Sequence, residues 1–241
     1  MAQPGGSVGS TADEERIRRE RAEMASTIAH EVRNPIASIR GLASTGAQLY
    51  DKLSDAERRE FFELIDQEAK RLGRMAEEIS TAMKLDAGVV TYERRDHPLG
   101  DPVRTAAEAI DRHEHPLLVE IDDGVRASID PGRIAEIVGH LIENAVKFSP
   151  PDAAVEVRVL HEGGDAVIEV SDGGPGIPAD RREEAFGRFV RFRPAGYEDV
   201  PGAGLGLHIS RALAVAHGGT IIAEAAPSGG TMQRVTIPTE R

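Results

Sequence analysis

The sequence predicts a multidomain α and α+β chain, a helical hairpin followed by an α/β sandwich. Through the first third of the chain, apolar residues recur at helical spacing with one polar interruption at 50–55. Further along, short β-like runs alternate with helical stretches, which is typical of a sheet covered by helices. A Gly- and Pro-rich segment at 173–203 predicts a long loop, which would be either a functional lid or disordered. The expected organisation is a flexible tail at 1–12, a hairpin at 13–88 and a second domain at 89–241.

Two long helices joined by a short turn account for the first part. Thr11 and Glu14 have the spacing of a capping box, which predicts a helix start. Two apolar stripes follow, one formed by Ile17, Met24, Ile28, Val32, Ile39, Leu42 and Leu49 and the other by Phe61, Ile65, Leu72, Ile79 and Met83. Because two helices cannot enclose stripes this wide, we expect a second copy to complete a dimeric four-helix bundle. Packing onto the chain's own second half is the alternative.

The second part contains the signals of a mixed sheet with helices. One helix is predicted from Pro131 to Lys147, with Asp130 as its N-cap. Another is predicted from Leu205 to His217, ending at the glycine pair that follows. Strands are expected at 117–121, 154–160, 166–172, 220–224 and 233–238.

Composition excludes several functional classes. The 29 Lys and Arg residues face 41 Asp and Glu residues, and the net charge of −12 opposes binding to nucleic-acid backbones. With no Trp and 4% aromatic residues, base-stacking platforms are also not expected. The lack of cysteine excludes disulfides and thiolate metal sites and suits a reducing cytosol. A phosphate-bearing ligand must therefore be held by a local site that overcomes the global charge.

The first helix carries a candidate nucleophile in the segment TIAHEVRNPIASIRG. His30 lies about 200° around the helix from Ile28, so it projects away from the apolar stripe. Its neutral imidazole has a lone pair for attack. Glu31 is placed to orient the ring or accept its proton, and Asn34 lies one turn further on the same face, where its amide can position a water. Pro35 weakens the helix beside this group. An ordinary surface histidine is the alternative interpretation.

Polar residues at helical spacing mark a candidate ligand site in HLIENAVKFSP (140–150). His140, Asn144 and Lys147 fall on one face of the predicted helix, with apolar residues behind them. The carboxamide oxygen of Asn144 is a suitable ligand for Mg²⁺, and Lys147 is a cationic donor for phosphate. A plain amphipathic helix with a solvated polar face would show the same pattern.

Two glycine-rich segments follow in order. In SDGGPGIP, Asp172 ends a predicted strand and can accept a hydrogen bond from an exocyclic amine, while Gly174 and Gly176 leave room for a ligand to approach the backbone. The alternative is a plain Gly-Pro turn.

In PGAGLGLHIS, Gly202, Gly204 and Gly206 lead into a helix start, where backbone amides and the helix dipole favour phosphate. GxGxG alone is a weak signal, and the chain contains no GxxxxGK[ST] loop.

Taken in order, these motifs resemble those of the sensor histidine kinases of two-component systems. HExxNP on a helical hairpin is similar to their H box, and NAVKFSP, DGGPGIP and GAGLGLHIS resemble their N, G1 and G2 boxes. AFGRFVRF (185–192) resembles the F box, in which Phe186 and Phe189 anchor the lid. The resemblance covers roughly residues 20 to 238. It implies a sandwich of the GHKL (Bergerat) ATPase type, the group that includes gyrase, Hsp90 and MutL.

The resemblance implies a role for each motif residue of the hairpin. His30 would be phosphorylated, Glu31 would act as its base, and Asn34 would serve a phosphatase activity. The chain would be a transferase, a protein histidine kinase that phosphorylates His30 with ATP and relays the phosphoryl group to an aspartate. The implied partners are a second copy of the chain and a response-regulator receiver domain.

The resemblance also implies how ATP and Mg²⁺ are bound. Asn144 would ligate Mg²⁺, Lys147 would contact phosphate and Asp172 would read adenine. The lid glycines would wrap the triphosphate, with its charge offset by Arg188, Arg191 and Arg193. His140 departs from the pattern, since the family usually has asparagine there. Imidazole is a poorer partner than an amide oxygen for hydrated Mg²⁺, so altered nucleotide handling is expected.

Two alternatives to the kinase hypothesis follow from the same residues. One is a phosphatase-biased or kinase-degenerate ATP-binding regulator, which HExxN and His140 keep open. The other is a dimeric scaffold with an inactive nucleotide domain, which the intact glycine motifs oppose. Because no stretch approaches the ~18 apolar residues of a membrane helix and the N-terminus lacks signal-peptide character, we expect a cytoplasmic chain, either alone or as the cytosolic part of a membrane-bound sensor.

Overall fold

The computed structural model describes residues 8–110, 115–198, 200–227 and 229–239, with the side chains of 8–21, 23 and 24 left undescribed. The chain divides into two compact units, Met1–Glu77 and Glu78–Arg241.

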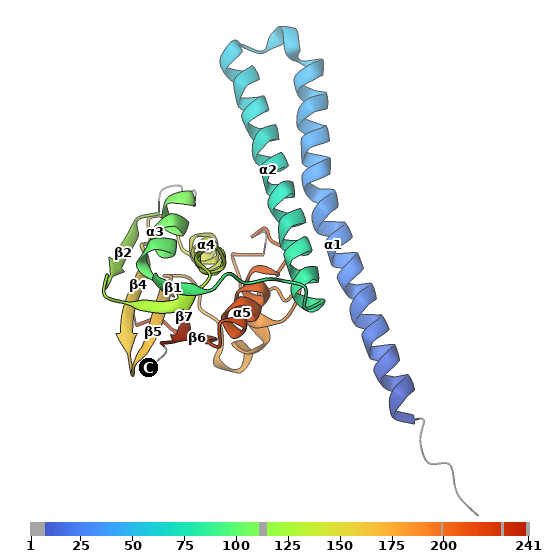
Figure 1. Ribbon diagram of the computed structural model, residues 1–241. Helices are drawn as coiled ribbons and strands as arrows, with labels where there is room; N and C mark the ends of the chain where they lie inside the picture. The colour runs from blue at the N-terminus through green and yellow to red at the C-terminus, as the bar shows by residue number, and fades with distance from the viewer. Residues whose placement is uncertain (1–7, 111–114, 199, 228, 240–241) are drawn as a thin grey trace, which may run out of the picture. The chain divides into compact units, whose positions relative to one another are not determined.

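The chain begins with a helical hairpin, α1 (Val8–Gln48), η1 (Tyr50–Lys52) and α2 (Asp55–Asp86), as Figure 1 shows. The first unit contains all of this hairpin except the end of α2 from Glu78 onward, which belongs to the second unit. The helix break predicted at 50–55 is confirmed. The start predicted near Thr11 is wrong, because α1 already begins at Val8 and runs through part of the segment assigned to the tail. Residues 1–7 of that tail lie outside the described residues.

A capping box fixes the start of α2. The Ser54 backbone N–H donates to the Glu57 carboxylate at 2.7 Å, and the Glu57 N–H donates to the Ser54 hydroxyl at 3.3 Å. These reciprocal bonds satisfy two amides that the first turn of a helix leaves without partners. The turn geometry that reverses the chain is therefore encoded locally in the sequence.

Large apolar side chains of the hairpin remain exposed in the single chain. Phe62 is 67% exposed, and Ile36 and Leu64 are also on the surface. Exposed apolar side chains of this size on long helices indicate a surface for interaction with another protein surface. Among the described residues, no helix is apolar enough over a sufficient length to cross a bilayer.

The second unit contains a five-stranded sheet in the order β2-β4-β5-β7-β6, in which β2 and β4 are parallel and the other pairs antiparallel. Its strands are β2 (Leu117–Ile121), β4 (Val155–Glu162), β5 (Asp165–Ser171), β6 (Thr220–Ala225) and β7 (Thr231–Pro238). All five match predicted strands to within two residues. The α/β sandwich expected from the sequence is confirmed.

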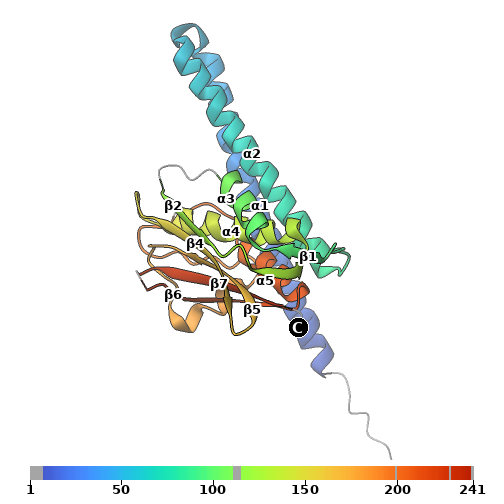
Figure 2. The ribbon, with the colours of Figure 1, turned by 60° about the vertical axis from the view of Figure 1, so that its left-hand side comes forward.

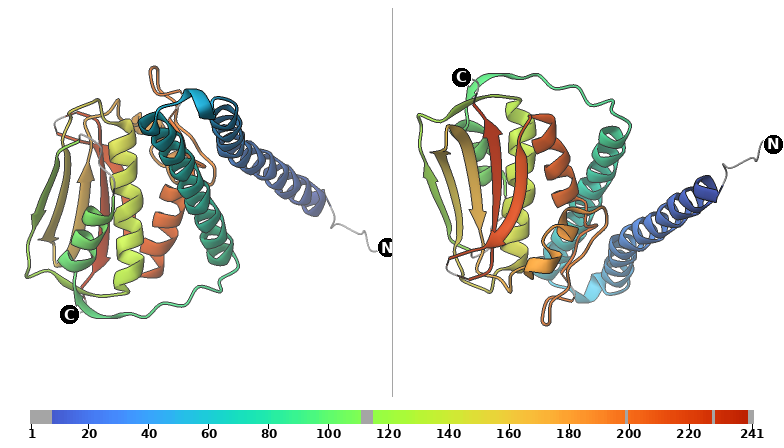
Figure 3. Two further views of the ribbon diagram at one scale, coloured as in Figure 1. Left: turned by 90° about the horizontal axis from the view of Figure 1, so that it is seen from above. Right: turned by 90° about the horizontal axis from the view of Figure 1, so that it is seen from below.

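Three helices cover one face of this sheet, α3 (Gly100–Ala109), α4 (Pro131–Phe148) and α5 (Gly206–Ala216), as Figures 2 and 3 show. A small antiparallel pair, β1 (Arg95–Pro98) and β3 (Arg126–Ile129), and the short 3₁₀ turns η2 (Ala179–Arg181) and η3 (Glu184–Phe186) complete the unit. β1, β3 and α3 were not predicted, because the two strands are only four residues long and α3 begins with the loop-like residues Gly-Asp-Pro.

The core lies between the sheet and α4. The Asp130 carboxylate caps this helix by accepting from the Gly132 and Arg133 N–H groups at 3.0 and 3.2 Å, as predicted. Six residues of α4 are buried: Ile134, Ile137, Val138, Leu141, Ile142 and Ala145. Their 3.6-residue spacing leaves the polar residues of α4 on the opposite face.

A row of alternating charges crosses the other face of the sheet. Glu120, Arg158, Glu169 and Arg234 are neighbours on four adjacent strands. The Arg158 guanidinium lies 3.1 Å from the Glu120 carboxylate, and Glu169 lies 3.5 Å from Arg158 and 2.6 Å from Arg234. Although none of the helices of the described residues covers this face, Glu169 is only 5% exposed, because the two arginine side chains cover it.

A buried histidine joins α4, α5 and the segment before β1. The Asp130 backbone N–H donates to His217 Nε2 at 3.1 Å, so Nδ1 carries the proton and donates to the Leu213 carbonyl at 2.7 Å. The Tyr92 ring packs edge-on against His217 at 5.9 Å, and the Glu93 N–H donates to the Asp130 carboxylate. Burial lowers the pKa of His217, so the structure requires its neutral form.

We expect the stability of this unit to fall on acidification through His217. Its pKa is lowered in the folded state, so below about pH 6.5 the unfolded chain binds the additional proton. The free energy of unfolding should fall by up to about 1.4 kcal/mol per pH unit as the pH drops from there toward the folded pKa, and stay level above it. Urea unfolding at about pH 7.5 and about pH 5.5 measures this change.

His217→Gln should be less stable at the higher pH and lose part of the pH dependence. His161→Gln, at an exposed position on β4, is the matched control and should behave as the parent. An undiminished pH dependence in His217→Gln would contradict the assignment.

Candidate functional site

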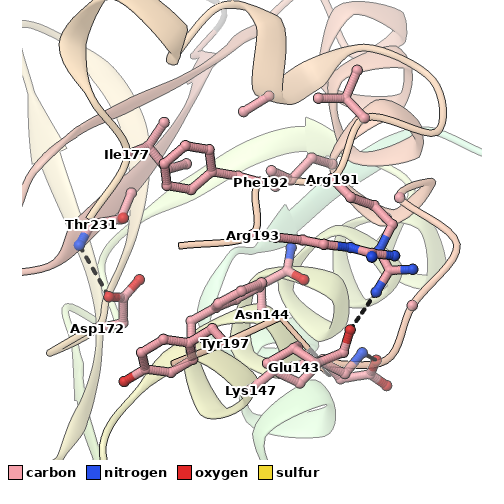
Figure 4. Close-up of a pocket in the computed structure, with 18 of the residues that line it drawn as sticks. Glu143, Asn144, Lys147, Asp172, Ile177, Arg191, Phe192, Arg193, Tyr197 and Thr231 are labelled. Atoms are coloured by element: carbon pink, nitrogen blue, oxygen red, sulfur yellow. Dashed lines mark hydrogen bonds and ion pairs between the residues drawn. The ribbon is translucent and has the colours of Figure 1, made fainter. Parts of the chain in front are cut away.

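A pocket opens between α4, the segment after β5, the loop before α5 and β7, and Figure 4 shows its side chains. Its lining includes His140, Glu143, Asn144, Lys147, Phe148, Asp172, Gly176, Ile177, Arg191, Arg193, Tyr197, Gly202, Gly204, Gly206, Thr231 and Gln233. Three motifs far apart in the sequence therefore meet in one site.

The polar face of α4 forms one wall. His140, Asn144 and Lys147 all line the pocket, so the face predicted from their spacing is confirmed. Lys147 Nζ lies 3.1 Å from the Glu143 carboxylate, one helical turn away. The cation expected to contact phosphate is thus held by an acidic neighbour on the same helix.

His140 is packed against the start of α5. A Cβ atom at Gly206 would lie 3.2 Å from His140 Nδ1, so a larger residue there would push the imidazole by a few tenths of an ångström. His140 Nε2 is buried and has no hydrogen-bond partner among the described residues. Because buried polar atoms are nearly always bonded, this nitrogen marks a position where a ligand group would be stabilised.

Asp172 stands at the end of β5 with its carboxylate held by backbone amides. Oδ1 accepts from the Gly174 N–H at 2.8 Å and from the Thr231 N–H at 3.1 Å. The residue is 8% exposed, and burial raises the pKa of its carboxyl, against the opposing effect of the two amides. Since both bonds go to Oδ1, Oδ2 can accept a hydrogen bond from an amine in the pocket.

The predicted glycines divide into two groups. Gly176, Gly202, Gly204 and Gly206 line the pocket, whereas Gly174 does not. A Cβ at Gly174 would lie 2.4 Å from the Phe148 carbonyl oxygen, so Gly174 permits the contact between the loop and the end of α4. Gly174 therefore serves the packing of the loop against α4 and not ligand contact.

A backbone hydrogen bond joins the two ends of the loop that precedes α5. The Phe189 N–H donates to the Gly204 carbonyl at 2.9 Å, and Phe186 is buried. Gly204 has φ 72°, and a Cβ there would lie 2.6 Å from the Val190 carbonyl oxygen. We name residues 187–204 the lid.

The three arginines predicted near a phosphate ligand do not all reach the pocket. Arg191 and Arg193 line it, but Arg188 does not. Arg188 instead donates to His208 Nε2 at 3.1 Å. The expectation that Arg188 helps to neutralise a ligand in this pocket is therefore not supported by its position.

Several lining residues were not predicted. Phe148 directly follows Lys147 on α4, so its helical position was a usable signal. Thr231 and Gln233 lie in the segment GGTMQRVTIP, which was predicted as the closing strand but not as part of a site. Tyr197 reaches the pocket through loop geometry, and no motif marks it.

The candidate nucleophile lies in the other unit, on α1. The side chain of His30 is 66% exposed, in agreement with its predicted direction. Its Nδ1 lies 3.9 Å from the carboxylate of Glu31, which is itself buried, and 3.5 Å from the Asn34 amide nitrogen. The three predicted residues therefore form one cluster, with Nδ1 directed at its polar neighbours.

The side chains that line the pocket suit a metal ion that enters together with a phosphate-bearing ligand, and not one held by the protein alone. In the described part of the chain, no group of three or more His, Asp or Glu side chains is placed to hold a metal ion. Asn144 contributes one amide oxygen, which suits Mg²⁺ bound mainly by phosphate oxygens and waters.

Two family models match the chain. Residues 20–88 match the His Kinase A (phospho-acceptor) domain, and residues 129–241 match the histidine kinase-, DNA gyrase B- and HSP90-like ATPase. The first match contains the His30 cluster, and the second contains the pocket residues named above.

Curated relatives match over most of the chain. The sensor protein KdpD of Clostridium acetobutylicum is 31% identical over 228 residues, covering 92% of this chain and 25% of its own length. The signal transduction histidine-protein kinase/phosphatase MprB of Mycobacterium tuberculosis is 31% identical over 237 residues, covering 93% and 46%. The chain thus spans between a quarter and a half of these relatives.

Solved structures agree in fold. The mycobacterial sensor histidine kinase MprB matches with a TM-score of 0.52 and 28% identity, covering 61% of this chain and 97% of that one. The Acinetobacter baumannii histidine kinase AdeS matches with a TM-score of 0.67 over 88% of this chain and 98% of that one; its 19% identity supports the fold alone.

We expect Gly204→Ala to disable the pocket without unfolding the domain. The substitution places a Cβ 2.6 Å from the Val190 carbonyl at a left-handed φ, so the base of the lid must shift. Affinity for a non-hydrolysable ATP analogue should fall by about 10-fold, with little change in the urea midpoint, because the strain is local.

Calorimetric titration measures the affinity. Gly139→Ala on α4, where a Cβ meets nothing within 4 Å, is the matched control. Unchanged affinity in Gly204→Ala would contradict the role given to the lid base.

Proposed function

The chain belongs to the sensor histidine kinases of two-component systems, and on that premise we propose that it phosphorylates its own His30 with ATP and passes the phosphoryl group to an aspartate of a response regulator. The observation that carries the proposal is the His30 cluster. An exposed imidazole with Nδ1 turned toward a carboxylate and an amide leaves Nε2 outward as the attacking atom.

Proton transfer follows from this geometry. The Glu31 carboxylate near Nδ1 favours the neutral tautomer with the proton on Nδ1, in which the Asn34 amide turns its oxygen, not its NH₂ group, toward the ring. In that tautomer Nε2 has the lone pair that attacks the γ-phosphorus as the bond to the ADP oxygen breaks. The ring then becomes more acidic at Nδ1. The Glu31 carboxylate, 3.9 Å from Nδ1 and shielded from solvent, is placed to accept that proton.

The pocket of the second unit would hold the nucleotide. Asp172 Oδ2 would accept from the adenine amino group, and the amides at the start of α5 would face the phosphates. Lys147 would exchange its partner Glu143 for a phosphate oxygen. Asn144 would hold Mg²⁺, which, when bound with ATP, offsets the charge on the transferred phosphoryl group.

Partner and location are part of the same proposal. The exposed apolar residues of the hairpin, Ile36, Phe62 and Leu64, support a homodimer in which two hairpins form a four-helix bundle. The receiving molecule would be a response-regulator receiver domain, and the reaction would take place in the cytoplasm, where ATP is available.

A second function is favoured by one contact. The Asn34 amide lies 3.5 Å from His30 Nδ1, so it can position a water as well as the ring. A phosphatase-biased regulator, which removes phosphate from its partner, is the second candidate.

Incubation with γ-labelled ATP and Mg²⁺ tests the kinase. The parent chain should acquire label that is labile to acid and stable to alkali, and His30→Gln should lose it entirely because no nucleophile replaces the imidazole. His97→Gln, on β1, is the control and should be labelled normally. Label that persists in His30→Gln would contradict the assignment of His30, and absence of label on a parent chain that binds ATP would favour the phosphatase-biased regulator.

A second prediction concerns the metal. Imidazole nitrogen favours Mn²⁺ over Mg²⁺ relative to an amide oxygen, so His140→Asn should tighten binding of the Mg²⁺ complex of an ATP analogue several-fold and change the Mn²⁺ complex little. Calorimetric titration with each metal gives the ratio of dissociation constants. His161→Asn is the control, and an identical ratio in His140→Asn and the parent would exclude His140 from the metal environment.

A further inference from the structure

Two aromatic rings from distant segments meet inside the pocket. Phe148 ends α4, and Tyr197 belongs to the lid. Their ring centroids are 6.0 Å apart, and the planes are inclined by 35°. Both residues line the pocket together with Asp172, and Figure 4 shows the Tyr197 ring among the side chains that face its interior.

The backbone of the lid builds the position of Tyr197. The Tyr197 N–H donates to the Pro194 carbonyl at 3.0 Å, which closes a turn with Gly196 at φ 85° in the position where a type II turn needs positive φ. The Val200 N–H donates to the Tyr197 carbonyl at 3.3 Å. Arg191 donates to the Val200 carbonyl and so ties the two ends of this segment together. Tyr197 is thus fixed between two consecutive turns.

The spacing of the two rings suits a third planar group. Stacked rings lie at van der Waals separation, about 3.5 Å, so a base between two rings requires centroids about 7 Å apart in parallel planes. The observed 6.0 Å and 35° differ from this arrangement by about 1 Å and a ring rotation, which are within reach of a loop side chain. Phe148, at the end of α4, whose apolar face is packed in the core, is the ring that stays in place.

We propose that Tyr197 stacks on the base of the bound nucleotide, which is then held between Tyr197 and Phe148. This inference rests on the proposed nucleotide binding and specifies what holds the base. Asp172 reads one edge of the base by a hydrogen bond, whereas the two rings contact its faces. Stacking acts on any purine, so Tyr197 adds affinity for the base and Asp172 adds selectivity for adenine.

Two ligands distinguish a residue that stacks on the base from one that shapes the lid. An ATP analogue offers a base and a triphosphate, whereas inorganic triphosphate offers only the phosphate part. A residue that stacks on the base affects the first ligand and leaves the second unchanged. A residue that shapes the lid as a whole affects both.

Calorimetric titration of the parent chain, Tyr197→Ala and Tyr197→Phe with the ATP analogue and Mg²⁺ tests the proposal. Tyr197→Ala should bind about 10-fold more weakly, and Tyr197→Phe, which keeps the ring, should bind as the parent does. Competition by inorganic triphosphate should be equal in all three. Equal or tighter binding of the analogue by Tyr197→Ala would overturn the proposal, since it would make the ring a bystander or an obstacle in the pocket.

The composition of the chain provides a direct optical test. It has no Trp and three Tyr, so Tyr50→Phe with Tyr92→Phe leaves Tyr197 as the sole strong fluorophore. Addition of the analogue should quench its emission in step with the calorimetric binding curve. The matched control carries Tyr197→Phe and Tyr92→Phe, reports from Tyr50 on the hairpin, and should show no quenching.

The outcomes also separate this inference from the proposed function. If the parent chain binds no nucleotide in calorimetry, the proposed nucleotide site is wrong and the inference falls with it. If nucleotide binds but Tyr197 emission is unchanged and Tyr197→Ala keeps the parent affinity, the nucleotide site stands and the stacking proposal alone is rejected.

Discussion

The division of α4 into two faces is the constraint on which the second unit depends. Its apolar face forms the centre of the core, and its polar face presents His140, Asn144 and Lys147 to the pocket. Both faces belong to one rigid helix, which Asp130 caps. The backbone that carries the pocket-facing side chains therefore cannot shift without disturbing the core. The same helix ends at Phe148, so the fixed aromatic wall of the pocket is positioned by core packing too.

The walls of the pocket opposite α4 are held mainly by backbone hydrogen bonds and turns, and not by core packing. Asp172 depends on backbone amides of Gly174 and Thr231, and the lid depends on turns and on one close approach at Gly204. Few buried apolar contacts secure such a loop, so it can open at lower cost than α4 can shift. A fixed helix opposite a movable lid allows a ligand to enter a site whose polar groups are already in position.

The sequence predicted those parts whose geometry is periodic. The five strands of the main sheet and the pocket face of α4 follow from alternation and from 3.6-residue spacing, and the Asp130 cap follows from local chemistry. The strands β1 and β3 are too short for a pattern to appear. Tyr197 could not be placed, because its position depends on turns set by Gly196 and on a bond from Arg191 that no local rule predicts. Arg188 was misplaced for the same reason, since loop side chains have no fixed period.

The global charge limits how recognition can proceed. In a chain of net charge −12, long-range attraction of a polyanion is weak, and Lys147 is already paired with Glu143 at 3.1 Å. A phosphate group can take over Lys147 only at hydrogen-bonding distance, where it competes directly with the carboxylate. Contacts to the uncharged base therefore have to supply the early binding energy, and these are made by Asp172, Phe148 and the proposed Tyr197. The site should consequently bind nucleotides more tightly than other polyanions, because a triphosphate without a base lacks the contacts that hold the ligand while Lys147 changes partners.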